Sequence, residues 1–171
     1  MSLHSFRRSV AADMATTVCL QFDAFDPSVE LSHFTAKHPL AGGFVSFLGQ
    51  VRASESGGTA VEALELTHYE PLTLPGMQAL ADEVLSRWGL DGLLILHRAG
   101  VMVPGDPIVL VAAAARHRRD AFAAADFAMD HLKSESWFWK REKVGGVWRW
   151  VEPREEDHAD LARWKLSESG N

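Results

Sequence analysis

A helical repeat of apolar residues at positions 75–88 constrains the fold of this chain more than any other feature. The apolar side chains recur there at steps of three and four residues, which places them on one face of a helix. They are Met77, Leu80, Ala81, Val84, Leu85 and Trp88. A similar pattern predicts a second long helix at residues 119–133, with Ala121, Phe122, Ala125, Met129 and Leu132 facing inward. The sequence therefore predicts two long amphipathic helices.

Shorter apolar runs between turn residues predict strands and one further helix. The capping residue Asp26 and the proline at position 27 precede a short helix that continues to Lys37. Leu64 and Leu66 alternate with polar neighbours, which is typical of a half-exposed strand. The expected strands span residues 44–51, 61–69, 93–97 and 108–114, and residues 137–143 and 147–152 form a hairpin around Gly145-Gly146.

Hairpin-like links join some of these strands, so the sheet is expected to be mixed or antiparallel and the fold class α+β. A chain of 171 residues is sized for one globular domain. We expect a flexible extension at residues 1–15, a single domain at 16–165 and a flexible tail at 166–171. The glycine pairs lack the strand, loop and helix spacing of a dinucleotide or nucleoside-triphosphate loop, which argues against those cofactors.

The net charge and the numbers of cysteines and histidines argue against several functional classes. The net charge of -6 argues against broad binding to nucleic acid or to an anionic membrane. The single cysteine, Cys19, lies before the predicted motifs and suits a reducing cytoplasm, and no targeting segment is recognised. The histidines have no His or Cys partners at ligand spacing, so no metal site is expected. These histidines include His68, His97, His117 and His131.

Basic residues gather where the last core strand is expected to lead into the second long helix. Arg116, His117, Arg118 and Arg119 lie at a helix N-terminus, where cations are unfavourable unless an anion joins them. A bound phosphate would resolve this conflict. Alternatively, Asp120 and neighbouring acids pair with the arginines on a solvated surface. The residues alone leave both readings open.

Two lysines flank the end of that helix. Lys133 lies in its last turn, and Lys140 lies inside the aromatic stretch 137–142. A lysine between aromatic rings is partly desolvated, which lowers its pKa and favours an amine that can act as a base or nucleophile. In the alternative reading, Lys133 only complements the helix dipole, and Lys140 points into water while the rings fill the core.

Two further arginines are candidates for a phosphate site. Arg52 follows the strand that ends at Gln50-Val51 and precedes the loop 53–58, where its guanidinium can clamp a phosphate. Arg149 lies between Trp148 and Trp150 and can either enter the same cleft or stack on an aromatic neighbour.

Taken in order, several motifs resemble the large subunit of molybdopterin synthase. The most specific pair is Asp130-His131-Leu132-Lys133 followed by Phe138-Trp139-Lys140-Arg141-Glu142. The others are Phe47-Leu48-Gly49-Gln50-Val51-Arg52, His68-Tyr69, His97-Arg98-Ala99-Gly100, Pro104-Gly105-Asp106 and His117-Arg118.

The resemblance implies an α/β-hammerhead fold and a sulfurtransferase. It implies a homodimer within a heterotetramer, in which each large subunit binds a small ubiquitin-like sulfur carrier whose Gly-Gly tail ends in a thiocarboxylate. On that basis sulfur passes to cyclic pyranopterin monophosphate, two transfers build the dithiolene of molybdopterin, and no external cofactor is required.

The resemblance also implies residue roles. Lys133 and Lys140 match the catalytic lysines. Gln50, Val51, Arg52, His117, Arg118, Arg141 and Glu142 match substrate-binding positions, and Phe47, Met129 and Arg149 are further candidates for contact with the substrate or the carrier tail. Many relatives have lysine where this chain has Gln50, and an Asn-rich loop at positions 53–56.

Two other functions are weighed against this one. A non-catalytic adaptor would bind the ubiquitin-like carrier without turnover, which the presence of both lysines argues against. A different transferase for a phosphate-containing ligand would bind an anion without needing a Gly-Gly-tailed protein.

Overall fold

The computed structural model describes residues 7–9, 15–54, 58–134, 137–152 and 159–164. Within these, strands form a five-stranded sheet of order β1-β2-β5-β7-β3 and a four-stranded sheet of order β6-β4-β8-β9. The strands are β1 (Arg7–Ser9), β2 (Thr16–Gln21), β3 (Gly43–Gln50), β4 (Ala63–His68), β5 (Gly92–Arg98), β6 (Gly100–Met102), β7 (Pro107–Ala115), β8 (Phe138–Val144) and β9 (Val147–Val151). The helices are α1 (Pro27–Lys37), α2 (Thr73–Trp88) and α3 (Arg118–Ser134), and residues 159–164 are also helical.

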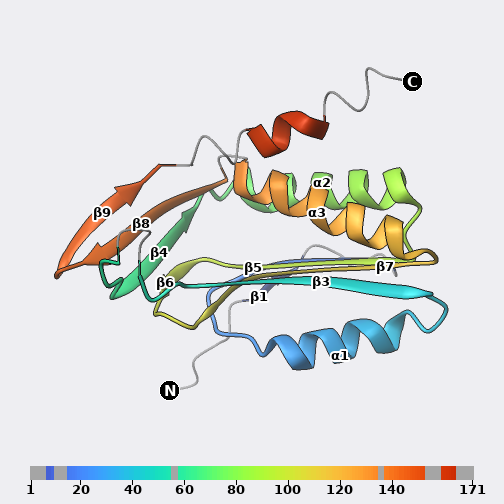
Figure 1. Ribbon diagram of the computed structural model, residues 1–171, viewed down its shortest axis with the longest axis horizontal. Coiled ribbons are helices and arrows are strands. Elements are labelled where there is room, and N and C mark those ends of the chain that lie inside the picture. Colours follow the sequence, from blue (N-terminus) through green and yellow to red (C-terminus); the bar gives the residue numbers. More distant parts are fainter. Residues whose placement is uncertain (1–6, 10–14, 55–57, 135–136, 153–158, 165–171) are drawn as a thin grey trace.

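The larger sheet lies between two layers of helix. Helix α1 covers one face, α2 and α3 cover the other, and the smaller sheet projects from one end (Figure 1). Strand β5 is buried on both faces: Leu93 and Ile95 join the core under α2 and α3, whereas Leu94 and Leu96 join the core under α1. This double burial explains the continuous apolar run at 93–96, which differs from the alternation of a half-exposed strand.

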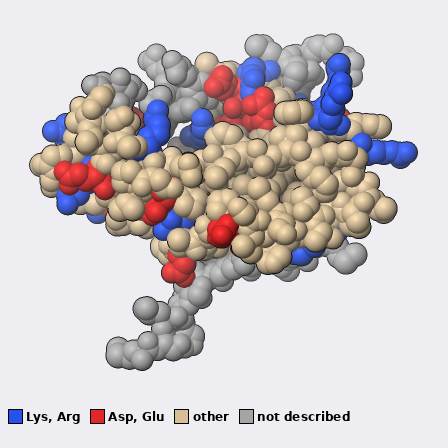
Figure 2. Space-filling view, turned by 60° about the horizontal axis from the view of Figure 1, so that its bottom comes forward, with Lys and Arg blue, Asp and Glu red and all other residues tan. Residues whose placement is uncertain are grey.

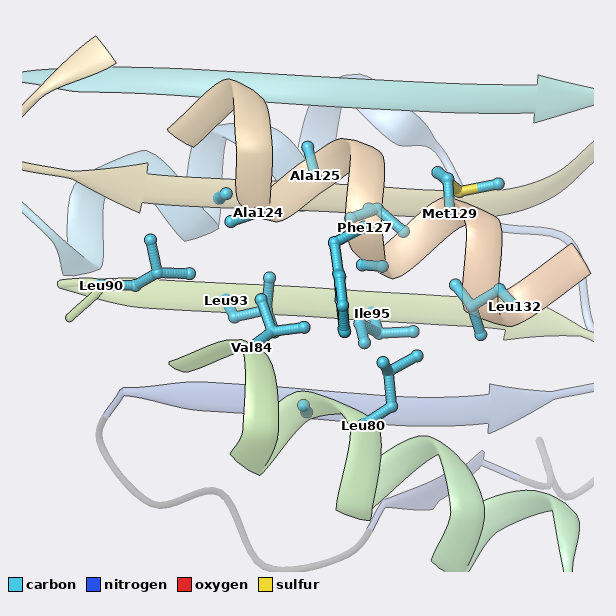
Figure 3. Close-up of a cluster of buried hydrophobic side chains, with 14 of the residues drawn as sticks. Leu80, Val84, Leu90, Leu93, Ile95, Ala124, Ala125, Phe127, Met129 and Leu132 are labelled. Carbon is cyan, nitrogen blue, oxygen red and sulfur yellow. The ribbon is translucent and has the colours of Figure 1, made fainter. Parts of the chain in front are cut away.

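The core between the larger sheet and α2 and α3 is apolar throughout. Val84 from α2, Phe127 from α3 and Ile95 from β5 converge there (Figure 3). Opposite them, β7 ends in four buried alanines at positions 112–115, and α3 turns alanines toward the sheet. Small side chains on both elements allow the helix axis to approach the sheet closely, which places α3 directly alongside β7 and β3.

Local signals mark the ends of several elements as the sequence predicts. The Asp26 carboxylate accepts hydrogen bonds from the backbone N–H groups of Ser28 (2.8 Å) and Val29 (3.3 Å) at the start of α1. Gly145 and Gly146, with φ of 58° and 77°, form the tight turn between β8 and β9. The predicted α+β class, the two long amphipathic helices and the hairpin are confirmed, with bounds that shift by one or two residues.

The sheet is mixed, as expected. Strand β2 runs parallel to β5, whereas the other pairs within the two sheets are antiparallel. Strands β2 and β6 were not predicted, because neither carries a clear alternation between turn signals. The described strand β1 lies within the stretch expected to be an extension. Residues 1–6, 10–14, 55–57 and 166–171 lie outside the described residues, so the predicted flexible extension and tail, and part of the predicted loop 53–58, stay predictions.

Cys19, which lies inside the predicted domain 16–165, is fully buried in β2. One prediction about the core was wrong. Phe122 does not face inward, because its side chain is 63% exposed. Consecutive helical residues are about 100° apart, so the buried face defined by Ala121, Ala125 and Ala128 turns position 122 toward solvent. None of the helices in the described ranges is long and apolar enough to cross a bilayer.

Candidate active site

An open groove of about 830 Å³ runs along α3. Its walls come from β3, α3 and the helical residues 159–164. The residues that line it include Val45, Ser46, Phe47, Arg118, Arg119, Phe122, Met129, Asp130, Lys133, Arg163 and Trp164. The groove therefore collects four of the predicted site residues: Phe47, Arg118, Met129 and Lys133.

The basic cluster lies at one end of this groove. The backbone passes from β7 into α3 there, as predicted, and Arg116, His117, Arg118 and Arg119 are all exposed. Figure 2 shows basic side chains projecting from this end of the molecule. Among the described residues, no ion pair joins Asp120 or another carboxylate to these arginines. The described structure therefore favours the anion-site reading over surface pairing.

Lys133 lies at the opposite end of the groove, exposed in the last turn of α3. The nearest acid along the helix face, Asp130, is buried and already has other partners. Its Oδ2 accepts hydrogen bonds from Arg163 Nε (3.1 Å), Arg163 Nη2 (2.6 Å) and Trp164 Nε1 (2.7 Å). These bonds raise the pKa of Arg163 and hold residues 159–164 against α3. Within the described ranges, no carboxylate forms an ion pair with Lys133.

One chain does not bring the two ends of the groove together. At about 1.5 Å per residue, Arg118 and Lys133 lie roughly 22 Å apart along the axis of α3. Strand β3 runs in the same direction: a Cβ on Gly43 would lie 3.7 Å from Arg118 Cα. The far end of β3, with Gln50 and the exposed Arg52, consequently lies toward the Lys133 end.

The Pro-Gly-Asp turn holds the end of β3. The Val51 N–H donates to the Asp106 carbonyl (3.0 Å), and the Val51 carbonyl accepts from the Gly105 N–H (2.9 Å). The Val51 side chain is buried with Leu64 of the smaller sheet, and its backbone groups bond to the turn, so Val51 fixes the end of β3 and does not present a free group to a ligand. The Gln50 side-chain amide donates to the Gly105 carbonyl at 3.4 Å, and Arg52 is exposed.

The remaining candidates lie on the smaller sheet and divide between its two faces. Lys140 pairs in register with Leu66, and Glu142 with Leu64 and Arg149, so these polar residues share the face that carries the buried leucines. Lys140 Nζ lies 2.7 Å from Glu142 Oε1. This placement contradicts the alternative in which Lys140 points into water while the rings fill the core.

Arg141 and Trp139 occupy the other face of the smaller sheet. The Arg141 guanidinium pairs with Glu65 and lies over the rings of Trp148 (4.8 Å) and Trp150 (5.7 Å). Trp139 is 64% exposed. Arg141 therefore does not share a face with Lys140 and Glu142, because successive residues of a strand point to opposite faces.

Sequence reasoning missed the groups that join the two sheets. His97 of β5 is fully buried and stacks on Phe138 of β8, with ring centroids 4.1 Å apart. Burial lowers the pKa of His97 to about 4, so the ring is neutral near pH 7 and its Nδ1 donates to the Arg98 carbonyl (2.9 Å). The motif 97–100 contributes to the family resemblance, but the sequence alone did not indicate that His97 packs against Phe138. Among the described residues, no three side chains are grouped as a metal site.

Comparison with known proteins adds independent information. The family model described as "MoaE protein" matches residues 20–135. A molybdopterin synthase catalytic subunit from Ralstonia nicotianae is 42% identical over 150 residues, which cover 88% of this chain and 85% of the relative. A protein of the same name from Cereibacter sphaeroides is 44% identical over 147 residues, or 86% of this chain and 99% of the relative.

A solved structure shows the same fold. The molybdopterin cofactor biosynthesis protein E from Burkholderia multivorans superposes with a TM-score of 0.73 at 41% identity, over 90% of this chain and 98% of that one.

Proposed function

This chain belongs to the MoaE protein family, and we infer that it works as the catalytic subunit of a molybdopterin synthase. We further propose the chemistry of the reaction: sulfur passes from the C-terminal thiocarboxylate of a small ubiquitin-like carrier to cyclic pyranopterin monophosphate, which gains the dithiolene of molybdopterin. The relatives' name, a catalytic subunit, is consistent with a separate partner chain that supplies the sulfur.

The groove along α3 is the observation that carries this proposal. It ends at Lys133, an exposed lysine without a described carboxylate partner. Phe47 and Met129 form part of an apolar wall of the same groove. An extended, partly apolar channel suits a Gly-Gly tail, which is narrow because it has no side chains. A thiocarboxylate that reaches the end of the groove would meet the Lys133 amine.

Lys133 and Lys140 have complementary surroundings for this reaction. The Lys133 ammonium has no described counter-ion, so it can stabilise negative charge that develops as sulfur attacks. Lys140 is 35% exposed and has Glu142 as a proton-accepting neighbour at 2.7 Å, so it suits proton transfer. Both amines lie close to the short connection between α3 and β8.

The phosphate of the substrate has two candidate sites. Arg52 lies toward the Lys133 end of the same chain. His117 and Arg118 lie roughly 22 Å from Lys133 along α3, which exceeds the reach of one small substrate. A homodimer, as the resemblance implies, would reconcile these positions if the basic cluster of one copy completed the lysine end of the other.

The proposal is tested by product formation from cyclic pyranopterin monophosphate and thiocarboxylated carrier. We expect dithiolene product with the wild-type protein and a rate about 10²- to 10⁴-fold lower for Lys133→Ala, in the range of a lost acid, base or charge-stabilising group. Lys37→Ala is the matched control, because Lys37 is an exposed lysine at the end of α1 on the opposite side of the larger sheet.

The same experiment separates the rival functions. Carrier binding without product from the wild-type protein would favour the non-catalytic adaptor. Phosphate-ligand binding without carrier binding would favour another transferase. Full activity of Lys133→Ala would retain the family but overturn the role of this lysine.

Two further expectations belong to this function. The reaction as written needs no external cofactor, since the carrier supplies the sulfur and the protein supplies proton-transfer groups. We propose that the reaction takes place in the cytoplasm, because a chain with a single cysteine suits a reducing compartment.

A further inference from the structure

Trp137, which lies between the two lysines in the sequence, is anchored by contacts with α2. Lys133 is next to the last residue of α3, Lys140 is the third residue of β8, and Trp137 lies between them. Whatever fixes Trp137 therefore influences the distance between the two amines. Among the described residues, Thr73 and Gly76 contact Trp137 directly, and His97 contacts the next residue, Phe138.

Thr73 provides the polar contact. It is the first residue of α2 and is 0% exposed. Its Oγ1 accepts a hydrogen bond from the Tyr69 N–H (3.0 Å) and lies 2.8 Å from the Trp137 carbonyl and 3.0 Å from the Tyr69 carbonyl.

The single hydroxyl proton is directed to Trp137. The Tyr69 carbonyl already accepts the N–H groups of Leu72 (3.0 Å) and Thr73 (2.9 Å), which occupy its two lone pairs. Donation to the Trp137 carbonyl is also the shorter contact. A buried carbonyl that loses its donor is costly, so the bond ties Trp137 to the start of α2.

Gly76 provides the steric contact. A Cβ at this position would lie 2.6 Å from Cε2 and Nε1 of the Trp137 indole, so the ring rests directly on the α2 backbone. The next residue, Phe138, stacks on the buried His97 of β5. Trp137 is thus held against α2, and Phe138 against the larger sheet.

We propose that Thr73 is a positioning residue for sulfur transfer, because its buried hydroxyl fixes the backbone midway between Lys133 and Lys140. The inference rests on the proposed function of the two lysines. Thr73 touches neither substrate nor carrier in this scheme; it acts through the Trp137 carbonyl. Gly76 serves the same purpose by admitting the Trp137 ring.

The test compares Thr73→Val, which keeps the shape but loses the hydroxyl, with Thr73→Ser, which keeps the hydroxyl. We expect Thr73→Val to lower kcat by about tenfold to a hundredfold, the scale of a small displacement of reacting groups. The KM for the pterin should stay unchanged within about twofold, since phosphate-binding residues lie elsewhere. Thr73→Ser should restore kcat.

Thr35→Val is the matched control. Its hydroxyl also donates to a carbonyl, that of Ser32 at 3.1 Å, but on the exposed side of α1. Its kcat should equal that of the wild type. Melting temperatures of all variants show that each is folded at the assay temperature.

Gly76→Ala tests the inference if Thr73→Val does not fold. Alanine favours the helix, while its methyl group displaces the half-buried Trp137 ring. We expect a lower kcat with an unchanged KM. A wild-type kcat in a folded Thr73→Val or Gly76→Ala, or an equal loss in Thr73→Ser and Thr73→Val, would overturn the inference.

Failure of the proposed function gives a different result. In that case the wild-type protein forms no product, or Lys133→Ala and Lys140→Ala retain full activity. If only the positioning role is wrong, wild-type activity and its dependence on the lysines persist, and removal of the Thr73 hydroxyl has no effect on kcat.

Discussion

The two sheets of this protein differ in how they are buried. Strands β5 and β7 of the larger sheet are covered on both faces, and their central residues are inaccessible to solvent. Strands β8 and β9 of the smaller sheet are mostly half-buried or exposed. The larger sheet therefore supplies most of the hydrophobic stabilisation, and the smaller sheet presents charged and aromatic side chains to the surroundings.

The charges also differ between the two regions. On the smaller sheet they neutralise one another, as in the pairs Arg141–Glu65, Lys140–Glu142 and Lys143–Glu62. Along α3, which packs on the larger sheet, the described partners of Arg118 and Lys133 include no carboxylate. Unneutralised cations beside a groove are suited to an anionic ligand, whereas the Arg141–Glu65 pair links β8 to β4.

The contrast predicts that stability depends far more on the larger sheet. Ile95→Ala should lower the free energy of unfolding by about 2–5 kcal/mol, because it leaves a cavity in a fully buried core. Val101→Ala on β6 of the smaller sheet, where the side chain is 56% exposed, should change it by less than about 0.5 kcal/mol. Denaturant unfolding measures both, and equal effects would refute the contrast.

The junction between the sheets should be sensitive to pH. The folded-state pKa of His97 is about 4, below the ordinary 6.5, because burial disfavours the charged ring. As pH falls below 6.5 the unfolded chain binds a proton that the folded protein does not, so stability falls until about pH 4 and then levels off. The expected loss from His97 is about 3 kcal/mol, from about 1.4 kcal/mol per pKa unit.

Unfolding free energies measured between pH 7 and pH 4 check this dependence. His97→Asn should remove the contribution of His97 to the change of unfolding free energy with pH. Ile95→Ala should be less stable than the wild type at each pH but should keep the same dependence on pH. An unchanged slope in His97→Asn would place the pH sensitivity elsewhere.

A modest effect is expected on the face of the smaller sheet that carries Arg141. Glu65→Gln should cost roughly 0.5–1 kcal/mol, since Arg141 and Glu65 are partly exposed and solvent screens their attraction. The cost should shrink in high salt. A salt-independent loss above about 2 kcal/mol would show that this pair is structurally as important as the buried core.

Much of the fold was predictable because its signals are local. The steps of apolar residues in α2 and the cap at Asp26 act over one or two helical turns, and the structure confirms them. The prediction for Phe122 was wrong because an apolar residue at the border of a helix face can point either way. Strand β2 was missed because its burial depends on β5, which lies more than 70 residues away in the sequence.

The candidate site was likewise predictable only in part from the sequence. Sequence order alone located the basic cluster at the start of α3 and Lys133 near its end, because a helix follows the chain. It could not show which face of β8 lies on the side of the buried leucines of β4, since that is decided only by the pairing of the two strands. Nor could it reveal the Thr73 hydroxyl bond to Trp137, which joins residues 64 positions apart.

The amino-acid sequence by itself determined the helices, most strands, the α+β class and the family resemblance, because each depends on patterns within short windows or on motif order. Tertiary structure decided which charges are neutralised, which remain available along the groove, and how the two lysines are held. These depend on contacts between segments distant in sequence, where burial, strand register and hydrogen-bond geometry are settled only when the whole domain has packed.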